Sequence, residues 1–361
     1  MTNRDRVLGA YIGAAIGDAM GGPVEGNHAA RIRRTVGDIT GLLPYHKPWR
    51  IIEELHAGYA LHEAPGTITD DTFIRADFTR FFLETPAPRT PRVLGNWLLA
   101  NANFDWWWGP AVEALRRVER GEVSAEEAGD TYLQGGGIGW WTPLGILHAG
   151  DPAAADAEAR RLCRIWKAPL ERNLLGAVQA GLAEGLREGA TADTLVETVL
   201  SFCGPLAKAL LTRAIEIAEA ARSVQDLATR LYDKVLMPPM AFDGGPEPPR
   251  AIDAPLPPVI DPLADSDSMY ITCYFAEQIP LAMAGFVYAL GEPDAIPVTV
   301  MLGRDADSTS TTVGSWVGAL HGESGLPAEW VGPVCEANLR EIDIRALATS
   351  LADAVSGAGT A

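Results

Sequence analysis

The chain has 361 residues, of which 47% are hydrophobic and 21% are charged, a balance typical of a globular protein with a substantial core. Its formal charge of −18 argues against nucleic acid or an anionic membrane as the main partner. Bound metal could neutralise part of this charge, although acidity that simply keeps the protein soluble explains it equally well. The four cysteines, at positions 163, 203, 273 and 335, lack metal-binding spacing, which fits a reducing cytoplasm.

The first predicted helix carries Gly9, Gly13 and Gly17 on one face, at i, i+4 spacing. Each glycine costs about 1 kcal/mol of helix stability relative to alanine. We therefore expect that these glycines allow the backbone of a neighbouring helix to come very close.

This N-terminal segment also resembles a signal peptide, because Arg4 and Arg6 precede an apolar run over residues 7–16. Asp5 and Asp18 bracket the run, however, and no clean cleavage site follows, so we interpret it as a buried helix. No apolar stretch was expected to reach the ~18 residues that a membrane span requires.

Further helices are predicted where alanine, leucine and arginine dominate and β-branched alternation is scarce. These ranges are 73–83, 93–102, 110–120, 153–166, 174–188, 192–202, 205–221, 270–290 and 308–321. Proline is frequent over residues 237–267, which predicts a surface loop, with a lid over a pocket as the alternative.

Two acidic clusters dominate the chain, Thr69-Asp70-Asp71-Thr72 and Asp305-Ala306-Asp307-Ser308, and each runs into a predicted helix. Carboxylates and hydroxyls are the oxygen ligands that Mg²⁺ prefers. Either cluster alone is readily explained as a helix N-cap. Two clusters, with a third acidic turn from Asp18 to Glu25, favour a site for two metals. Because the clusters flank the proline-rich segment, we expect one domain over residues 1–361 whose ends meet.

Three blocks, residues 17–25, 69–72 and 303–308, resemble the ADP-ribosylglycohydrolase family in their order and spacing. This family includes the hydrolase that removes ADP-ribose from dinitrogenase reductase, and the resemblance extends from Val7 to Trp330. It implies an all-α orthogonal helical bundle with a dinuclear metal site at its centre. It also implies a hydrolase that acts on ADP-ribosyl substrates.

The same resemblance implies a set of metal ligands from both clusters: Thr69, Asp70, Asp71, Asp305, Asp307 and Ser308. The expected cofactor is a pair of Mg²⁺ ions, with Mn²⁺ as a substitute. Ser308 stands where the family usually has threonine, and its hydroxyl can still bind metal. Glu25 and Asp305 are the expected catalytic residues, with Glu25 as the base or orienter of a water. Asp18 is expected to brace its turn by hydrogen bonding.

A glycine-rich loop is expected to bind the substrate through Gly135, Gly136, Gly137, Ile138, Gly139, Trp140 and Trp141. Its backbone N–H groups could cradle a phosphate. The family usually has asparagine at position 136 and a Met-Arg pair at positions 140 and 141. Losing the arginine removes a bidentate anion donor, while two indoles add stacking surface. Packing of both tryptophans in the core is an equally good alternative.

The favoured function is therefore Mg²⁺-dependent hydrolysis of an N-glycosidic bond to ADP-ribose or a related ribosyl group, free or linked to protein. Three alternatives stay open: hydrolysis of a smaller ribosyl N-glycoside, a two-metal phosphohydrolase, and a non-catalytic family member with a binding or structural role. The sequence does not indicate an oligomeric state.

Overall fold

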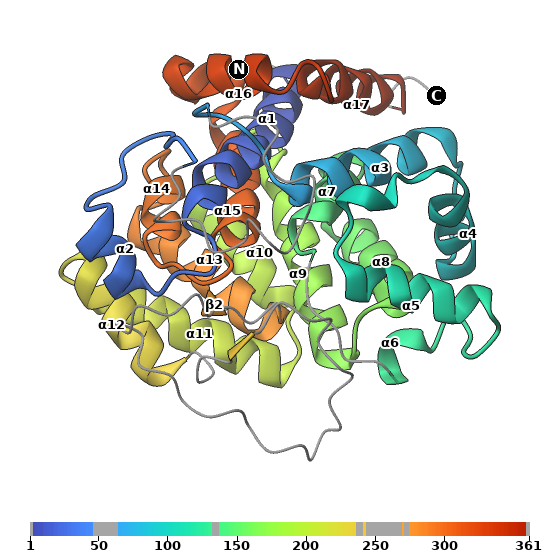
Figure 1. Ribbon diagram of the computed structural model, residues 1–361, viewed down its shortest axis with the longest axis horizontal. Coiled ribbons are helices and arrows are strands. Elements are labelled where there is room, and N and C mark those ends of the chain that lie inside the picture. The colour runs from blue at the N-terminus through green and yellow to red at the C-terminus, as the bar shows by residue number, and fades with distance from the viewer. Residues whose placement is uncertain are drawn as a thin grey trace.

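The computed structural model describes residues 3–45, 64–131, 137–235, 241–242, 269–270 and 274–358. These residues form an all-α fold, as the resemblance implied (Figure 1). The helices are α1 Asn3–Gly21, α2 Ala29–Thr35, α3 Asp70–Glu84, α4 Pro91–Asn101, α5 Gly109–Glu119, α6 Ala128–Thr131, α7 Thr142–Leu147, α8 Pro152–Leu162, α9 Pro169–Gly185, α10 Ala192–Phe202, α11 Pro205–Ala220, α12 Val224–Lys234, α13 Phe275–Tyr288, α14 Ala295–Val300, α15 Ala306–His321, α16 Ala328–Ala337 and α17 Ile344–Ala358. Two short strands, β1 Ala241–Phe242 and β2 Met269–Tyr270, pair antiparallel.

The helix predictions agree with these elements except at a few boundaries. The range 270–290 is shortened to α13, and 153–166 becomes α8 followed by a 3₁₀ turn, η5 Cys163–Ile165. No helix was predicted from the sequence at several observed elements, namely α2, α6, α7, α12, α14, α16 and α17. Apart from β1, the proline-rich range 237–267 lies outside the described residues, so its role as a loop or lid stays a prediction.

Helices α1 and α15 cross in direct backbone contact at the centre of the fold (Figure 1). A Cβ atom built on any of the four α1 glycines would overlap the α15 backbone, at these pairs of residues: Gly9 with Gly318, Gly13 with Gly314, Gly17 with Ser310, and Gly21 with Ala306. The hydroxyl of Ser310 also donates a hydrogen bond of 2.8 Å to the carbonyl oxygen of Gly17. The expected close approach of a neighbouring helix is confirmed.

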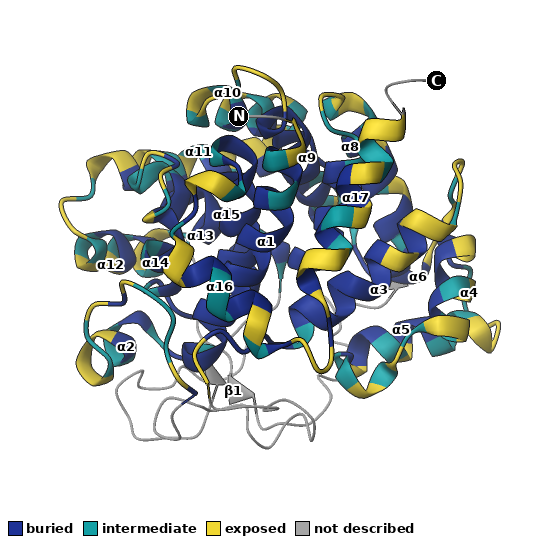
Figure 2. Cartoon of the chain, turned by 90° about the horizontal axis from the view of Figure 1, so that it is seen from above, coloured by how far each residue is buried: buried dark blue, intermediate teal, exposed yellow. Residues whose placement is uncertain are grey.

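Helix α1 is almost wholly buried, from Val7 to its end (Figure 2). The segment Asn3–Val24 is long and apolar enough to pass for a membrane span, contrary to the expectation that no stretch would reach that length. Inside the protein, 94% of its most apolar window is buried. The apolar surface of this helix is therefore used in packing, as expected for a core helix.

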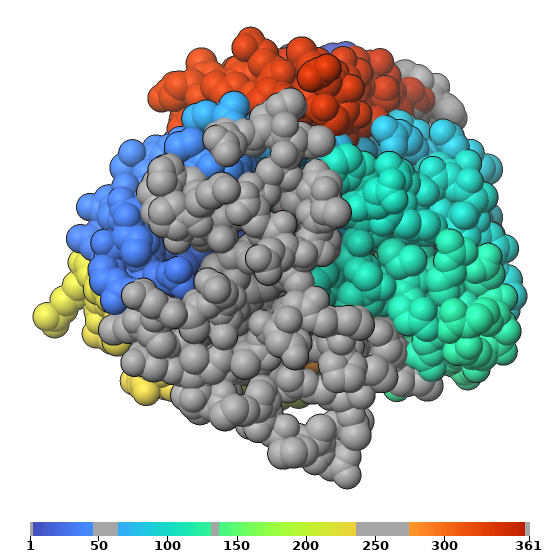
Figure 3. Space-filling view, viewed as in Figure 1, coloured from blue at the N-terminus to red at the C-terminus, as the bar shows by residue number. Residues whose placement is uncertain are grey.

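Helix α3 packs across α1 near Tyr11. The Tyr11 hydroxyl lies 3.0 Å from the Thr79 hydroxyl, and the guanidinium of Arg75 lies 5.1 Å from the centre of the Tyr11 ring. The loop that leads into α3 is held by Asn338, whose side chain accepts from the Ile68 N–H (3.2 Å) and donates to the Gly66 carbonyl (2.9 Å). Helices α16 and α17 cover this end of the molecule (Figure 3).

The α1–α15 contact leads to a stability prediction. Gly13→Ala should destabilise the protein by about 1–3 kcal/mol or more, because its methyl group meets backbone atoms of Gly314 that cannot move independently. Gly95→Ala in α4 is the matched control, since its methyl group would lie 3.5 Å from Ile165 and has room. The control should gain up to about 1 kcal/mol from helix propensity. Urea denaturation measures the free energy of unfolding of both variants. If Gly13→Ala were stabilised as much as Gly95→Ala, the close backbone contact would be contradicted.

Candidate metal centre

The first acidic cluster forms the N-terminus of α3. The Thr69 hydroxyl accepts a hydrogen bond from the Asp71 N–H (3.3 Å) and so caps the helix. Asp70 and Asp71 occupy the first turn, where the positive end of the helix dipole favours carboxylates. The cap and the metal-site interpretations are therefore compatible for this cluster.

Asp18, at the end of α1, lies beneath this turn and is fully buried. One carboxylate oxygen accepts from the backbone N–H (3.0 Å) and the hydroxyl (2.7 Å) of Thr69. The other accepts from the N–H of Thr72 (3.0 Å) and from its hydroxyl. Asp18 was expected to brace its own turn by hydrogen bonding, but these hydrogen bonds hold the turn of the first cluster, at Thr69 and Thr72.

The second acidic cluster follows a tight turn at Gly303 and Arg304. Both have positive φ angles, 72° and 65°, and for a non-glycine residue such as Arg304 this conformation costs about 1–3 kcal/mol. The turn is held by backbone hydrogen bonds of 2.8 Å from the Arg304 N–H to the Asn27 carbonyl and from the Gly26 N–H to the Arg304 carbonyl. This pairing places Glu25, the residue before Gly26, beside Asp305.

The two clusters meet at Asp307. Carboxylate oxygens of Glu25, Asp305 and Asp307 lie within 4.8 Å of one another, and so do those of Asp70, Asp71 and Asp307. Asp307 thus belongs to both groups, as expected of a ligand shared by two metals.

The hydroxyl residues join the same constellation. The Ser308 hydroxyl donates to Asp71 (2.6 Å), and the Thr69 hydroxyl lies 3.0 Å from an Asp307 oxygen. The structure therefore brings together the full set of residues expected to bind metal. Their role as ligands stays a prediction.

The electrostatics of these carboxylates suit a hard divalent cation. Burial, and secondly repulsion from neighbouring carboxylates, raises the pKa of each of them well above its ordinary value; for Asp305 the pKa rises to about 7. Among the described residues, the buried Oε2 atom of Glu25 has no hydrogen-bond partner. Because oxygen ligands and uncompensated negative charge favour Mg²⁺-like ions, the donor set fits such a group.

The glycine-rich loop is only partly described. Gly135 and Gly136 lie outside the described residues, whereas Gly137 adopts a φ of 84°. Gly139 packs so closely on Thr311 of α15 that a Cβ atom would overlap its side chain. Since Thr311 lies one turn beyond Ser308, this end of the loop lies beside the helix that carries the second cluster.

Trp140 and Trp141 are 3% and 1% exposed. They belong to the 3₁₀ turn η4 Gly139–Trp141 and pack into an aromatic cluster. The Trp141 ring lies 4.8 Å from Phe78, and the Trp140 ring lies 5.5 Å from Trp107, between centroids. Their stacking surface is thus used by other side chains of the protein, as the core-packing alternative proposed. Substrate binding by the loop stays a prediction.

Several residues near the site carried no sequence signal that we used. Arg75 is fully buried, donates to the Thr72 hydroxyl (2.7 Å), and lowers the pKa values of Asp18 and Asp71 against the effect of burial. Its position four residues after Asp71 on α3 was an available signal. Glu277 and Gln278 of α13 contact Arg304 and Asp305, and nothing in the local sequence indicated this.

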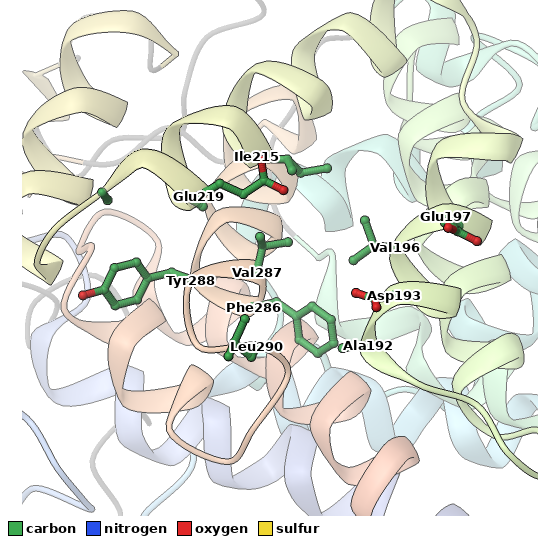
Figure 4. A pocket seen from close by; sticks show the side chains of 12 residues that line it. Ala192, Asp193, Val196, Glu197, Ile215, Glu219, Phe286, Val287, Tyr288 and Leu290 are labelled. Atoms are coloured by element: carbon green, nitrogen blue, oxygen red, sulfur yellow. The ribbon is translucent and has the colours of Figure 1, made fainter.

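A separate cavity of about 530 Å³ lies between α10, α11 and α13 (Figure 4). Its floor is apolar, with Phe286 and Val287 from α13, and Asp193, Glu197 and Glu219 lie around it. None of the expected metal ligands lines this cavity. It therefore belongs to a different part of the molecule from the carboxylate centre.

The fold and the site define the chain as an all-α protein with a central carboxylate cluster suited to two divalent cations. A family model described as ADP-ribosylglycohydrolase matches residues 1–361, so the chain belongs to that family. A solved structure titled "ADP-ribosylglycohydrolase-related protein complex" is similar, with a TM-score of 0.60 and 22% identity over 98% of this chain and 99% of that chain. At this identity the likeness shows the fold. A search of curated proteins found no match.

The raised pKa values predict how the stability of the metal-free protein depends on pH. A carboxyl whose pKa rises from about 4 in the unfolded chain binds more protons when folded, so stability falls as pH rises through that window. For Asp305 the window extends to about pH 7. Metal should offset this loss by linkage.

We therefore expect millimolar Mg²⁺ or Mn²⁺ to raise the melting temperature more at pH 8 than at pH 5. Asp307→Asn, which alters the shared ligand, should lose most of this metal-induced shift. Differential scanning calorimetry with and without metal measures both effects. A metal-induced shift of the same size at both pH values, or in both proteins, would count against the assignment.

Proposed function

We propose that this protein is a Mg²⁺-dependent hydrolase of the N-glycosidic bond that joins ADP-ribose, or a related ribosyl group, to its leaving group. Family membership supports a glycohydrolase acting on ADP-ribosyl-type substrates. The observation that carries the proposal further is the sharing of Asp307 between two groups of carboxylates. ADP-ribose linked to protein is included among the substrates, and we place the activity in the cytoplasm.

The metal pair would be held by Asp70 and Asp71 on one side, by Glu25 and Asp305 on the other, and by Asp307 between them. When bound, it would polarise a water and orient the hydroxyls of the ribose. The Ser308 hydroxyl, which donates to Asp71, and the Thr69 hydroxyl, which lies 3.0 Å from an Asp307 oxygen, would complete the set.

Glu25 is the proposed base. Its buried Oε2 atom, which has no hydrogen-bond partner among the described residues, suits a group that accepts a proton from the attacking water. The water oxygen then bonds to C1 of the ribose, the C1–N bond breaks, and its electron pair leaves with the nitrogen, which takes up a proton. The transition state resembles an oxocarbenium ion, so nearby carboxylates stabilise its positive charge.

The sequence of the glycine-rich loop bears on how the phosphates of a substrate would be bound. Position 141 holds a buried tryptophan, so the loop has no arginine there to bind a diphosphate. The backbone N–H groups around Gly137 and Gly139 are the remaining candidates for phosphate binding. We infer that diphosphate-bearing substrates bind less tightly here than in arginine-bearing relatives.

The proposed reaction is tested by Asp70→Asn. This variant should lose at least ~100-fold of the metal-dependent hydrolysis of an ADP-ribosyl substrate, because a metal ligand is weakened. Asp77→Asn is the control on the same helix: Asp77 is a buried aspartate that pairs with Arg80 and Trp107 and does not belong to the cluster. Circular dichroism checks the fold of both. Equal activity of the two variants would contradict the site.

The expected substrate preference can be measured by titration. A charge-assisted arginine contact is worth about 1.5–3 kcal/mol, so its absence should weaken ADP-ribose binding by about 10–150-fold relative to arginine-bearing relatives. Trp141→Phe should lower stability through lost packing on Phe78 but leave ligand affinity unchanged. Submicromolar ADP-ribose binding by the unaltered protein, or a large affinity change in Trp141→Phe, would refute this view of the loop.

A further inference from the structure

Side chains from the first turn of α13 contact the start of the second acidic cluster. The Gln278 amide donates a hydrogen bond from Nε2 to an oxygen of Asp305. The neighbouring Glu277 forms an ion pair of 3.2 Å with Arg304, and both side chains are 1% exposed. Two consecutive residues of α13 therefore fix Asp305, the first residue of the cluster, and Arg304, which precedes it.

The orientation of Gln278 follows from its surroundings. Its side chain is completely buried, and among the described residues its Oε1 atom has no hydrogen-bond partner. Turning the amide over would point Oε1 at the Asp305 carboxylate and replace an attraction with a repulsion. A buried amide with an unsatisfied oxygen costs stability. The contact with Asp305 is the feature of the structure that accounts for a polar side chain at this position.

Asp305 belongs to only one of the two carboxylate groups, the one with Glu25 and Asp307. The group formed by Asp70, Asp71 and Asp307 has a different support, because Asp18 holds the turn at Thr69 and Thr72. The two halves of the centre thus rest on separate supporting side chains. A change at Gln278 reaches one half directly and leaves the hydrogen bonds of the other intact.

We propose that Gln278 is a positioning residue that controls metal affinity at the Glu25–Asp305–Asp307 half of the centre, and not at the half formed by Asp70 and Asp71. The Gln278 N–H fixes one oxygen of Asp305, which leaves the other oxygen directed for coordination. This inference rests on the proposed metal-dependent function. Supporting residues of this kind typically change metal affinity by 10–100-fold when they are replaced.

To test this proposal, the metal-free protein is titrated with Mn²⁺. Binding is monitored by calorimetry and by electron paramagnetic resonance. The unaltered protein should bind two ions and show magnetic coupling between them. Gln278→Met, which keeps the shape but removes the donor, should weaken one binding event by 10–100-fold and leave the other within about threefold. At Mn²⁺ concentrations that fill only the stronger site, the coupling signal should disappear.

Two further variants keep the test decisive. Gln278→Asn retains an amide but is one methylene shorter, so it should show the same selective loss if contact with Asp305 is what matters. Gln179→Met is the matched control, because Gln179 on α9 is also a buried glutamine whose Oε1 has no partner among the described residues. It should leave both binding events unchanged.

A second comparison in the Glu25→Gln variant shows which half of the centre Gln278 affects. Because Glu25→Gln weakens the Glu25–Asp305–Asp307 half, one tight Mn²⁺ should remain at the other half. That ion should bind equally well with and without Gln278→Met. Loss of that remaining ion, or two unchanged binding events in Gln278→Met, would overturn the role of Gln278 while the metal centre stands. An unaltered protein that binds no Mn²⁺ would overturn the metal centre and this inference together.

Discussion

The close crossing of α1 and α15 determines where the acidic residues of this protein lie. Glycines on α1 allow its backbone to touch that of α15 along several turns, and the last contact pairs Gly21 with Ala306. Asp18 and Glu25 flank that point on one chain segment, and Asp305 and Asp307 flank it on the other. Residues almost 300 positions apart in the chain are therefore brought to one place by this helix contact and by the backbone pairing of Gly26 and Asn27 with Arg304. Larger side chains on α1 would separate the two helices and with them Glu25 from Asp305 and Asp307.

The second constraint is electrostatic. Packing at this crossing forces a set of carboxylates together under conditions that raise all of their pKa values. The helix dipoles of α3 and α15 and the buried guanidinium of Arg75 relieve part of the repulsion. The remaining excess of negative charge favours cation binding, and a bound metal would also contribute its binding free energy to folding stability. The strained turn at Arg304 fits the same picture, since strain of this kind is found at functional sites.

How much could be predicted from the sequence depends on whether a feature is local. The close helix contact made by the glycine stripe on α1 follows from spacing and residue type, and the structure confirms it. A hydrogen-bonding role was also expected for Asp18, but its partners, Thr69 and Thr72, lie in a distant segment that the local sequence did not indicate. The burial of Trp140 and Trp141 could not be decided, because it depends on rings contributed by distant segments, such as Phe78 and Trp107. Gln278 was missed for the same reason: its partner, Asp305, lies 27 residues further along the chain.

The carboxylate cluster and the glycine-rich loop are held by different parts of the fold. The residues expected to bind metal lie at the N-termini of α3 and α15, and α15 contacts the backbone of α1, which tolerates little change. The glycine-rich loop instead reaches the site through Gly139, which packs on Thr311 of the same helix α15. Substitutions further along the loop, such as tryptophan at positions 140 and 141, can be absorbed by the aromatic core without moving Asp307. The second acidic cluster and this end of the loop are thus both attached to α15, although different parts of the sequence hold them in place.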